Sequence, residues 1–520
     1  MSISGVPLSA AALGALDPAV QVPEYDRAAI TVGIVHFGVG GFHRAHEAMY
    51  VDRLMNQGQA LDWAICGVGV MPSDLAMRDA LDAQDGLYTL VIKHADGRLE
   101  PRVIGSIARY LYAPDDPEAV LGVLTDERTR IVSLTVTEGG YNVDPVTGQF
   151  DSNNPSVVQD AKGDRPPATV FGLVAEGLRR RRELGVAPFT VMSCDNIPGN
   201  GDLAKAMFAA YAELVDPDLA AWIRSSVSFP NSMVDRITPV TADSDRALLA
   251  DKFGLVDRWP VVCEAYTQWV LQEEFPTGRP AWEDAGVQLV DDVEPYELMK
   301  LRLLNASHQA MAYVGYLSGH RFAHEAATDP VIVEFLAGYM DEEGTPTLPE
   351  VPGVDLAAYK RSLIERFANP QVRDTIARLC AESSDRIPKW LLPVVRHNLA
   401  SGGEIRRSAA VVASWARYDE GVDEQGEPIE VVDRLSDELK SIAAQQKDHP
   451  LAFIENQALF GDLAKNEVFA DAFKRSLDQF HELGAHRTVE LLNESLRVKV
   501  VKSPQEAAPG PVLAPSQPKT

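Results

Sequence analysis

The chain has 520 residues, which is longer than one hydrophobic core usually supports, so its length predicts two domains. Its composition, 46% hydrophobic and 24% charged, is typical of a folded globular protein and excludes a disordered or fibrous chain. The formal net charge of -27 would repel a phosphate backbone or an anionic membrane, so we expect no nucleic-acid partner and no membrane partner.

Cysteine usage and the N-terminal residues indicate the compartment. The first residues, MSISGVPLSAAALGALDPAV, lack a basic start followed by a long apolar run, and no stretch of the sequence approaches about 18 uninterrupted apolar residues. The cysteines show no paired spacing typical of a disulfide scaffold or a metal site. They are Cys66, Cys194, Cys263 and Cys380. We therefore expect a cytoplasmic protein with reduced thiols.

In the first half of the chain, apolar strands alternate with helices. The β-branched segment TVGIVHF at 31–37 leads into the glycines of GVGG and then into a helical stretch, HRAHEAMYVDRLMNQG. Similar patterns predict strands at 63–68, 88–93, 130–136 and 188–194, and helices at 168–182 and 202–214. Strands that alternate with helices in this way predict an α/β domain with a parallel, doubly wound sheet.

Beyond about residue 290 the strand signals fade. Amphipathic segments follow one another at 298–317, 355–367, 405–418 and 431–446, which predicts a mostly helical second half. The last stretch, SPQEAAPGPVLAPSQPKT, is rich in Pro, Ala, Ser and Gln and predicts a disordered tail. The predicted organisation is an α/β domain over 1–290, a mostly helical domain over 291–502 and a tail over 503–520.

The glycine turn at the end of the first strand is a candidate dinucleotide site. A helix N-terminus with exposed N–H groups can hold a pyrophosphate when glycines let the backbone approach it. The third glycine of G-x-G-x-x-G would fall at position 43, which is histidine, and a packed turn is the alternative. The position of the turn between a strand and a helix favours dinucleotide binding. The candidate contacts are Phe37, Gly38, Val39, Gly40 and Gly41.

An acidic residue follows the second strand. Asp74 lies shortly after WAICGVGV, where a carboxylate can accept hydrogen bonds from the ribose hydroxyl and repel a 2′-phosphate. A solvated loop aspartate is the alternative interpretation. The position predicts a preference for NAD over NADP.

The segment ELMKLRLLNASHQA contains four polar residues that are candidates for the site. At about 100° per residue, Glu297, Lys300, Asn305 and His308 fall within an arc of about 140°, so they can share one side of a helix. A solvent-facing polar stripe is the alternative. The leucines and the methionine between them indicate burial, which lowers the pKa of a lysine toward that of a usable base.

Longer motifs support a family assignment. K-x4-N-x2-H at Lys300, Asn305 and His308 occurs together with GVGGFHRAH, TEGGY, SCDN, FPNSMVDRITP and EAYTQWVL. This combination, which extends from about residue 25 to 500, resembles the polyol-specific long-chain dehydrogenase/reductase family. The resemblance implies a Rossmann-type NAD-binding domain, a helical C-terminal domain, and an active site without a metal in the cleft between them. It also implies a monomer.

The resemblance implies NAD-dependent oxidation of a sugar alcohol such as D-mannitol to a ketose such as D-fructose, and the reverse reduction. Lys300 would be the general base, with Glu297 beside it on the same helix. Asn196 and Asn305 would donate hydrogen bonds to the developing alkoxide, and His308 would orient the substrate oxygen. Further implied roles are a proton-exchanging water channel for Glu138 and contacts to distant hydroxyls for Asp235 and Arg378.

One departure from the family pattern concerns the substrate. Where the mannitol enzymes of the family carry a lysine in a D-G-S-x-K-like stretch, this chain has AESSDRIPKW with Arg386, which keeps the charge but has a different reach. Arg386 would suit the carboxylate of fructuronate or tagaturonate, so a uronate reductase is one alternative. An arabinitol or sorbitol dehydrogenase is another. A dinucleotide sensor without catalysis is the alternative outside the enzymes, although such a chain should have lost Lys300.

Two histidine pairs could each present two imidazoles to zinc from one helix face. They are His43 with His46, and His320 with His324. Neither pair has an obvious third ligand nearby in the sequence, so we expect no metal.

Overall fold

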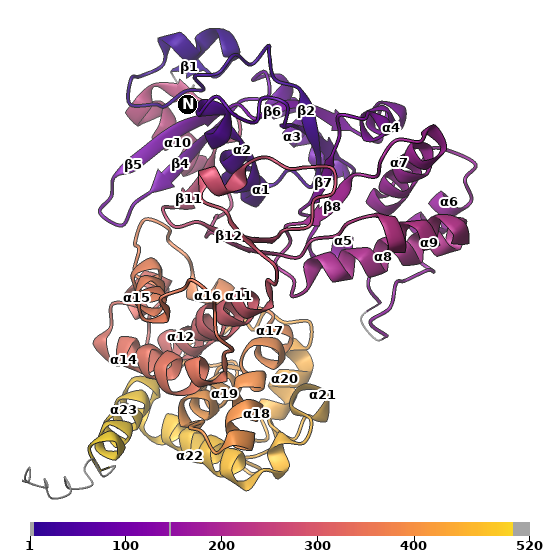
Figure 1. The fold of residues 1–520 in the computed structure, drawn as a ribbon. Coiled ribbons are helices and arrows are strands. Elements are labelled where there is room, and N and C mark those ends of the chain that lie inside the picture. Colours follow the sequence, from indigo (N-terminus) through magenta and orange to yellow (C-terminus); the bar gives the residue numbers. More distant parts are fainter. Residues whose placement is uncertain (1–4, 145–146, 503–520) are drawn as a thin grey trace, which may run out of the picture. The chain divides into compact units, whose positions relative to one another are not determined.

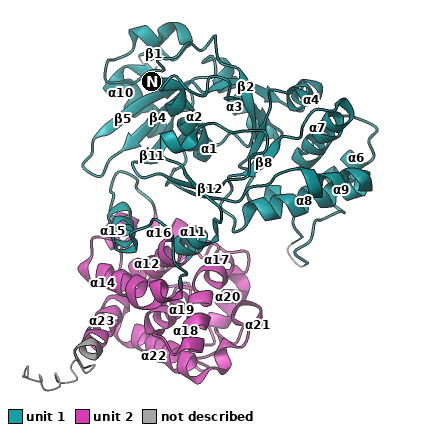
Figure 2. Ribbon diagram, viewed as in Figure 1, with its two compact units in different colours: residues 1–301, 348–374 teal, residues 302–347, 375–520 magenta. Residues whose placement is uncertain are grey.

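The computed structural model describes residues 5–144 and 147–502, and the predicted tail at 503–520 lies outside these residues. The chain divides into two compact units (Figure 2). Unit 1 comprises residues 1–301 and 348–374, and unit 2 comprises residues 302–347 and 375–520. The chain therefore leaves unit 1 after Leu301 and returns to it for one segment before it completes unit 2.

Unit 1 contains a five-stranded parallel sheet in the order β6-β3-β2-β7-β8 (Figure 1). The strands are β2 (Val32–Phe37), β3 (Ala64–Gly69), β6 (Ile107–Tyr112), β7 (Ile131–Leu134) and β8 (Thr190–Ser193). From the central β2 the chain proceeds to β3 and β6 on one side and then to β7 and β8 on the other. The switch point between β2 and β7 is where such sheets bind ligands, at the carboxyl ends of the strands. The predicted doubly wound fold class is confirmed.

Helices cover both faces of this sheet because alternate strand residues point in opposite directions. Val35 and Phe37 of β2 pack with α4, α7 and α8, whereas Ile34 packs with α2 and α3. The bounds are α2 (Glu47–Asn56), α3 (Leu75–Asp82), α4 (Pro117–Thr125), α7 (Val170–Leu184) and α8 (Asn200–Val215). The helices predicted at 168–182 and 202–214 correspond to α7 and α8.

The strand predicted at 88–93 forms, but not in the parallel sheet. β4 (Tyr88–Lys93) pairs antiparallel with β5 (Leu99–Ile104) and parallel with β11 (Val261–Glu264). The connection from β4 to β5 is a short turn with Gly97 at φ +83°, which lacks the length of the crossover that a parallel neighbour requires. The prediction that the strand at 88–93 joins the parallel doubly wound sheet is therefore wrong, because β4 belongs to a separate sheet.

Two smaller sheets and several short elements complete unit 1. The remaining strands are β1 (Val6–Pro7), β9 (Ser232–Asp235), β10 (Leu255–Val256), β12 (Gln268–Gln272) and β13 (Gln288–Val290), with β12 between β9 and β13. The remaining helices are η1 (Ala10–Ala15), α1 (Gly41–Ala45), η2 (Pro72–Asp74), α5 (Thr137–Gly140), α6 (Pro155–Ala161), α9 (Pro217–Ser226), α10 (Asp243–Phe253), η3 (Trp282–Ala285), α11 (Glu294–Met299) and α15 (Leu356–Phe367).

Unit 2 is built from helices, as the second half of the sequence predicts. The buried helix α19 (Arg406–Tyr418) packs against α12 (Ala306–Leu317) and α22 (Glu467–Leu483). The others are α13 (Ala323–Ala326), α14 (Pro330–Gly338), η5 (Tyr339–Gly344), η6 (Thr345–Thr347), α16 (Ile376–Cys380), α17 (Ser383–Trp390), α18 (Leu392–Ser401), α20 (Ser436–Ala443), α21 (Gln457–Phe460), η7 (Leu463–Lys465) and α23 (Ala485–Lys502). No helix in the described part of the chain has both the length and the apolar character needed to cross a membrane.

One predicted helix of unit 2 is shorter than expected. The amphipathic pattern at 431–446 corresponds to α20, which begins only at Ser436. The carboxylate of Asp433 accepts a hydrogen bond from the N–H of Leu435 at 2.8 Å and another from the hydroxyl of Ser384 at 2.6 Å. These bonds fix a turn ahead of the helix.

The helix predicted at 298–317 is continuous but not uniform. Between α11 and α12, residues Lys300–Asn305 form the π-helix η4. In an α-helix, residues five apart point about 140° away from each other. Hydrogen bonding from i to i+5 reduces this angle, and π segments are frequent at functional sites. The angle between the directions of Lys300 and Asn305 along this helix is therefore smaller than the α-helical value of about 140°.

Candidate active site

The turn after β2 needs glycine at one position and leaves space at another. Gly38 has φ +91°, and an added Cβ would lie 2.2 Å from the carbonyl oxygen of Thr135. At the exposed Gly40, the nearest atom to an added Cβ is 3.8 Å away. Gly38 is thus required by the fold, whereas Gly40 leaves open backbone that a ligand can approach. Such an opening suits the pyrophosphate of a dinucleotide.

The other predicted cofactor residues lie at the same edge of the sheet. Phe37 and Val39 are buried, and Gly41 begins α1. Asp74 ends η2, beyond the neighbouring strand β3, and its Oδ2 accepts hydrogen bonds from the N–H groups of Val70 and Met71, both at 2.9 Å. Its carboxylate is therefore held at the carboxyl end of the strand next to β2.

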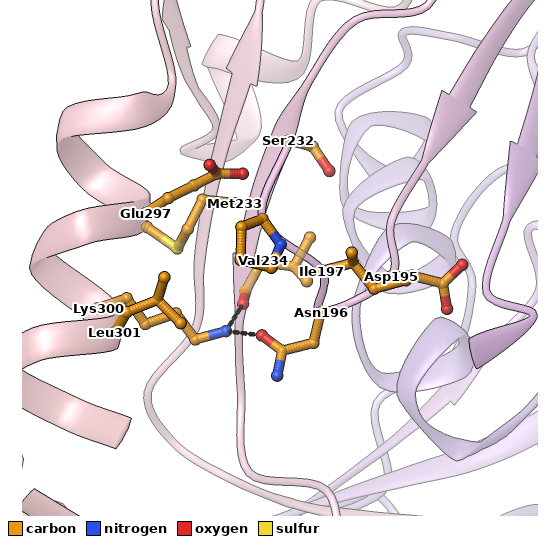
Figure 3. A pocket seen from close by; sticks show the side chains of 10 residues that line it. Asp195, Asn196, Ile197, Ser232, Met233, Val234, Glu297, Lys300 and Leu301 are labelled. Carbon is orange, nitrogen blue, oxygen red and sulfur yellow. Dashed lines mark hydrogen bonds between the residues drawn. The ribbon is translucent and has the colours of Figure 1, made fainter. Parts of the chain in front are cut away.

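A pocket lies within unit 1 (Figure 3). It is formed by the loop after β8, by β9, by α11 and by the first residues of η4. Its lining comprises Asp195, Asn196, Ile197, Pro198, Ser232, Met233, Val234, Glu297, Lys300 and Leu301. Three residues predicted to act in catalysis thus meet in one pocket, with Asn196 about a hundred positions before Glu297 and Lys300 in the sequence.

Lys300 is the buried cation of this pocket, with 8% of its surface exposed. Its Nζ donates one hydrogen bond to Oδ1 of Asn196 at 2.5 Å and another to the carbonyl of Val234 at 2.7 Å (Figure 3). Burial lowers the pKa of Lys300 below its ordinary value, and Asp235 opposes this shift. Arg366 lowers this pKa further. The lysine is therefore better able to accept a proton than a solvated one.

The loop that carries Asn196 is fastened to β9. Asn200 donates to the carbonyls of Asp195 at 2.9 Å and Ser232 at 2.8 Å, and the N–H of Ser232 donates back to Asn200 at 2.9 Å. Because the amide oxygen of Asn196 faces Lys300, its NH2 group points away from the lysine (Figure 3). That NH2 group can donate to an oxygen in the pocket.

Glu297 lines the same pocket and titrates near neutrality. Both carboxylate oxygens accept from the N–H of Gly199, each at 3.2 Å. Burial raises the pKa of Glu297 from 4.5 to about 7, against the lowering effects of the Gly199 N–H group and of Lys300. A carboxyl group with this pKa can both take up and release protons at physiological pH.

Asp235 is held by an arginine that sequence reasoning missed. Arg366 of α15 contacts both carboxylate oxygens of Asp235 at 2.8 and 3.0 Å, and it also pairs with Glu264 at 2.8 Å. All three side chains are at most 6% exposed. Asp235 follows Val234, so this cluster lies directly beside the carbonyl that binds Lys300. The sequence signal that could have revealed this cluster is a charged residue within each of two apolar patterns, Arg366 in α15 and Glu264 in β11.

The loop after β7 carries Glu138, which is exposed on α5. The N–H groups of Val136 and Thr137 donate to the carboxylate of Asp195 at 3.1 and 2.8 Å, and the hydroxyl of Tyr141 donates to it at 2.7 Å. The pocket residue Asp195 therefore fixes the loop of Glu138, a role that the sequence did not reveal.

The remaining predicted residues belong to unit 2. Asn305 is buried at the end of η4, and His308 is half-buried on α12. Arg378 is exposed on α16, and half-buried Arg386 on α17 donates to the carbonyls of Arg378 at 3.3 Å and Leu379 at 3.2 Å. Unit 2 therefore brings the two predicted substrate arginines together.

Comparisons with known proteins agree with this architecture. The profile of the mannitol dehydrogenase Rossmann domain matches residues 32–284, and that of the mannitol dehydrogenase C-terminal domain matches residues 292–481. Mannitol 2-dehydrogenase of Phaeosphaeria nodorum is 45% identical, covering 90% of this chain and 83% of the relative. Mannitol 2-dehydrogenase of Aspergillus fumigatus is 46% identical, covering 88% and 92%.

Two solved structures are also similar. One is Pseudomonas fluorescens mannitol 2-dehydrogenase in a ternary complex with NAD and D-mannitol, with a TM-score of 0.83, 43% identity, and coverage of 94% of this chain and 100% of that chain. The other is a D-sorbitol dehydrogenase in substrate-free form, with a TM-score of 0.87, 39% identity, and coverage of 93% and 100%.

Proposed function

The chain belongs to the mannitol dehydrogenase family, and from that premise we propose that it oxidises D-mannitol to D-fructose with NAD, and catalyses the reverse reduction, with Lys300 as the general base. The observation that carries this proposal is the buried Lys300, held between Asn196 and the Val234 carbonyl in a pocket. The similarity to the Pseudomonas fluorescens enzyme, solved with NAD and D-mannitol, supports the choice of cofactor and substrate.

The residues at the carboxyl edge of the sheet fit NAD. Gly40 leaves the backbone open beside α1, where pyrophosphate oxygens would meet exposed N–H groups. Asp74 is held where its carboxylate would accept hydrogen bonds from the ribose hydroxyls and repel a 2′-phosphate. Bound nicotinamide supplies the hydride acceptor of the oxidation.

The protein's own contribution is to move the proton and stabilise the oxygen that loses it. Neutral Lys300 takes the proton of the substrate hydroxyl, and its lowered pKa makes the neutral form accessible. The NH2 group of Asn196 donates to the developing alkoxide. Asn305, the last residue of η4, is assigned as the second donor. His308, one helical turn beyond Asn305, orients the same oxygen.

Glu297 passes the proton between Lys300 and solvent. It lines the pocket, and its pKa of about 7 lets it both take up and release a proton at physiological pH. Exposed Glu138 receives the proton at the mouth of this route, on the loop that Asp195 fixes.

Two groups of residues are assigned to the distant hydroxyls of the substrate. Asp235 is one, with Arg366 setting the direction of its carboxylate. Arg378 and Arg386 of unit 2 are the other. Because Arg386 is tied to the carbonyls of Arg378 and Leu379, it acts mainly by shaping the position of Arg378.

D-sorbitol is the second candidate substrate, because the D-sorbitol dehydrogenase structure is also similar to this chain. A nicotinamide absorbance assay with purified protein tests both across mannitol, sorbitol and arabinitol in oxidation, and fructose and fructuronate in reduction. The proposal expects the highest kcat/KM for D-mannitol and D-fructose with NAD(H). A higher kcat/KM for sorbitol would make D-sorbitol the preferred substrate. A higher kcat/KM for fructuronate would contradict both candidate substrates.

Asp74 provides a test of cofactor choice. We expect Asp74→Asn to raise the ratio of kcat/KM with NADP to that with NAD at least about tenfold, because the charge that repels a 2′-phosphate is lost. The amide oxygen can still accept from Val70 and Met71, so the loop should keep its shape. Steady-state kinetics with both cofactors measure the ratio.

The matched control is Asp79→Asn, which neutralises an exposed aspartate on the adjoining helix α3. Its ratio should equal that of the unaltered protein. An unchanged ratio in Asp74→Asn would remove Asp74 from the cofactor site.

A further inference from the structure

A buried polar cluster lies beneath the glycine turn of unit 1. It consists of His36 and Gly38 at the end of β2, Ser133 and Thr135 at the end of β7, and Glu47 at the start of α2; we call it the turn-support network. His36, Glu47 and Ser133 are at most 1% exposed. Burying a polar group without a hydrogen-bond partner costs free energy, so each donor in a buried cluster is expected to face an acceptor.

The network ends on the carbonyl of Gly38. This oxygen accepts from the hydroxyl of Thr135 at 2.7 Å and from the N–H of Gly40 at 2.7 Å. Since the Thr135 hydroxyl donates its proton there, its oxygen accepts from Nε2 of His36 at 2.9 Å. The Gly38 carbonyl is thus held both by the turn's own N–H group and by a side chain from the neighbouring strand end.

The opposite end of the network is a carboxylate. Oε2 of Glu47 accepts from the hydroxyl of Ser133 at 2.9 Å, so the oxygen of Ser133 accepts from Nδ1 of His36 at 2.7 Å. Nδ1 of His36 also lies 3.2 Å from Oε2 of Glu47, so the ring, the serine and the carboxylate are in mutual contact. Burial opposes the charge on Glu47, but the histidine rings beside it hold its pKa below the ordinary value.

The same residues could be considered as metal ligands, because His36, His43 and Glu47 place three ligand atoms within 4.8 Å of one another. The rings of His36 and His43 are stacked, however, with centroids 3.4 Å apart and planes 15° apart. In-plane lone pairs of parallel rings do not converge on one ion, and Nδ1 of His36 is engaged by Ser133. The geometry therefore favours the hydrogen-bond network.

We propose that His36, Ser133, Thr135 and Glu47 are positioning residues for the dinucleotide, because their buried chain of hydrogen bonds fixes the Gly38 carbonyl and with it the glycine turn. The inference rests on the proposed function, since it takes NAD to bind at this turn. None of the four residues needs to contact substrate. Loss of the network should therefore weaken cofactor binding and leave the chemistry at Lys300 unchanged.

Thr135→Val tests the bond to the turn directly, because valine keeps the shape of threonine without the hydroxyl. We expect the Kd of NADH, measured by fluorescence titration, to rise about fivefold to tenfold, as the loss of one net hydrogen bond implies. The KM of NAD should rise in parallel, whereas kcat at saturating NAD and the KM of mannitol should stay within about twofold. Thr135→Ser, which keeps the hydroxyl, should bind NADH like the unaltered protein.

Thr129→Val is the matched control, because Thr129 is buried and its hydroxyl donates to the carbonyl of Val123 at 2.8 Å, away from the turn. A second pair is Ser133→Ala, which breaks the link to Glu47, and Ser106→Ala, whose hydroxyl donates to the carbonyl of Ala48 at 2.7 Å. Only the network variants should lose affinity for NADH.

Two outcomes would overturn the inference. One is a Thr135→Val variant that binds NADH as tightly as the unaltered protein, and the other is an equal loss in Thr129→Val. Failure of the unaltered protein to bind NADH at all would instead contradict the proposed function. The two failures are therefore distinguishable in one set of titrations.

Discussion

Lys300→Ala should lower kcat for polyol oxidation at least about a hundredfold, the lower end of what general base catalysis supplies. Alanine removes the amine that takes the substrate proton and leaves the Val234 carbonyl without its partner. NADH binding should persist, because the glycine turn and Asp74 are separate from this pocket. Steady-state kinetics and an NADH titration measure the two effects. An added small primary amine should restore part of the lost rate.

Lys93→Ala is the control for Lys300→Ala. Lys93 is also a partly buried lysine of unit 1, and it pairs with Asp245 at 2.8 Å, but it does not line the pocket. Its replacement should leave kcat within about twofold of the unaltered value. Should Lys300→Ala keep a near-normal kcat with only a raised KM, Lys300 would be a substrate anchor and not the base.

Arg366→Met should lower the free energy of unfolding by about 3–5 kcal/mol. Methionine fills much of the space of arginine but leaves the buried carboxylates of Asp235 and Glu264 without their cation. Burial already raises the pKa of Glu264 above its ordinary value, and Arg366 opposes that shift. Without the arginine this pKa should rise further. A carboxyl group whose pKa is higher in the folded than in the unfolded protein destabilises the folded state at pH values where the group is ionised. The loss of unfolding free energy in Arg366→Met should therefore become smaller as the pH falls.

Urea unfolding at mildly alkaline and mildly acidic pH measures this effect. The control is Arg128→Met, which breaks the exposed pair of Arg128 with Asp126. Exposed pairs contribute about 0–1 kcal/mol, so the control should stay within that range. A loss of less than about 1 kcal/mol in Arg366→Met would contradict this account, because it would show that groups other than Arg366 stabilise the two buried carboxylates.

Much of the fold could be predicted because it depends on periodicity. Local burial is visible in the sequence as a run of apolar residues or as helical spacing of apolar residues. Examples are the β-branched run before Gly38 and the amphipathic segments after residue 290. The pairing of β4 with β5 could not be predicted in this way. It depends on a turn that reverses the chain, and the strand itself has the same apolar pattern as its parallel counterparts.

The candidate site was less accessible from the sequence. Asn196 and Lys300 could be identified from motifs, but the Val234 carbonyl that accepts a hydrogen bond from Lys300 is a backbone group without a side-chain signature. Residues Lys300–Asn305 form a π-helix, so a uniform α-helical projection does not describe the directions of these two side chains. Arg366 could not be assigned a partner, because Asp235 lies far from it in the sequence and meets it only in the folded unit.

The central claim, that Lys300 is the general base, is tested most directly by the pH dependence of kcat in both directions. Neutral lysine must receive the alcohol proton, so oxidation should rise with pH through one ionisation below the ordinary lysine pKa of about 10.4. Reduction of the ketose needs the protonated amine, so it should fall through the same ionisation. Profiles that mirror each other in this way are the predicted result. Profiles that change in the same direction, or an ionisation that persists in Lys300→Ala, would contradict the assignment.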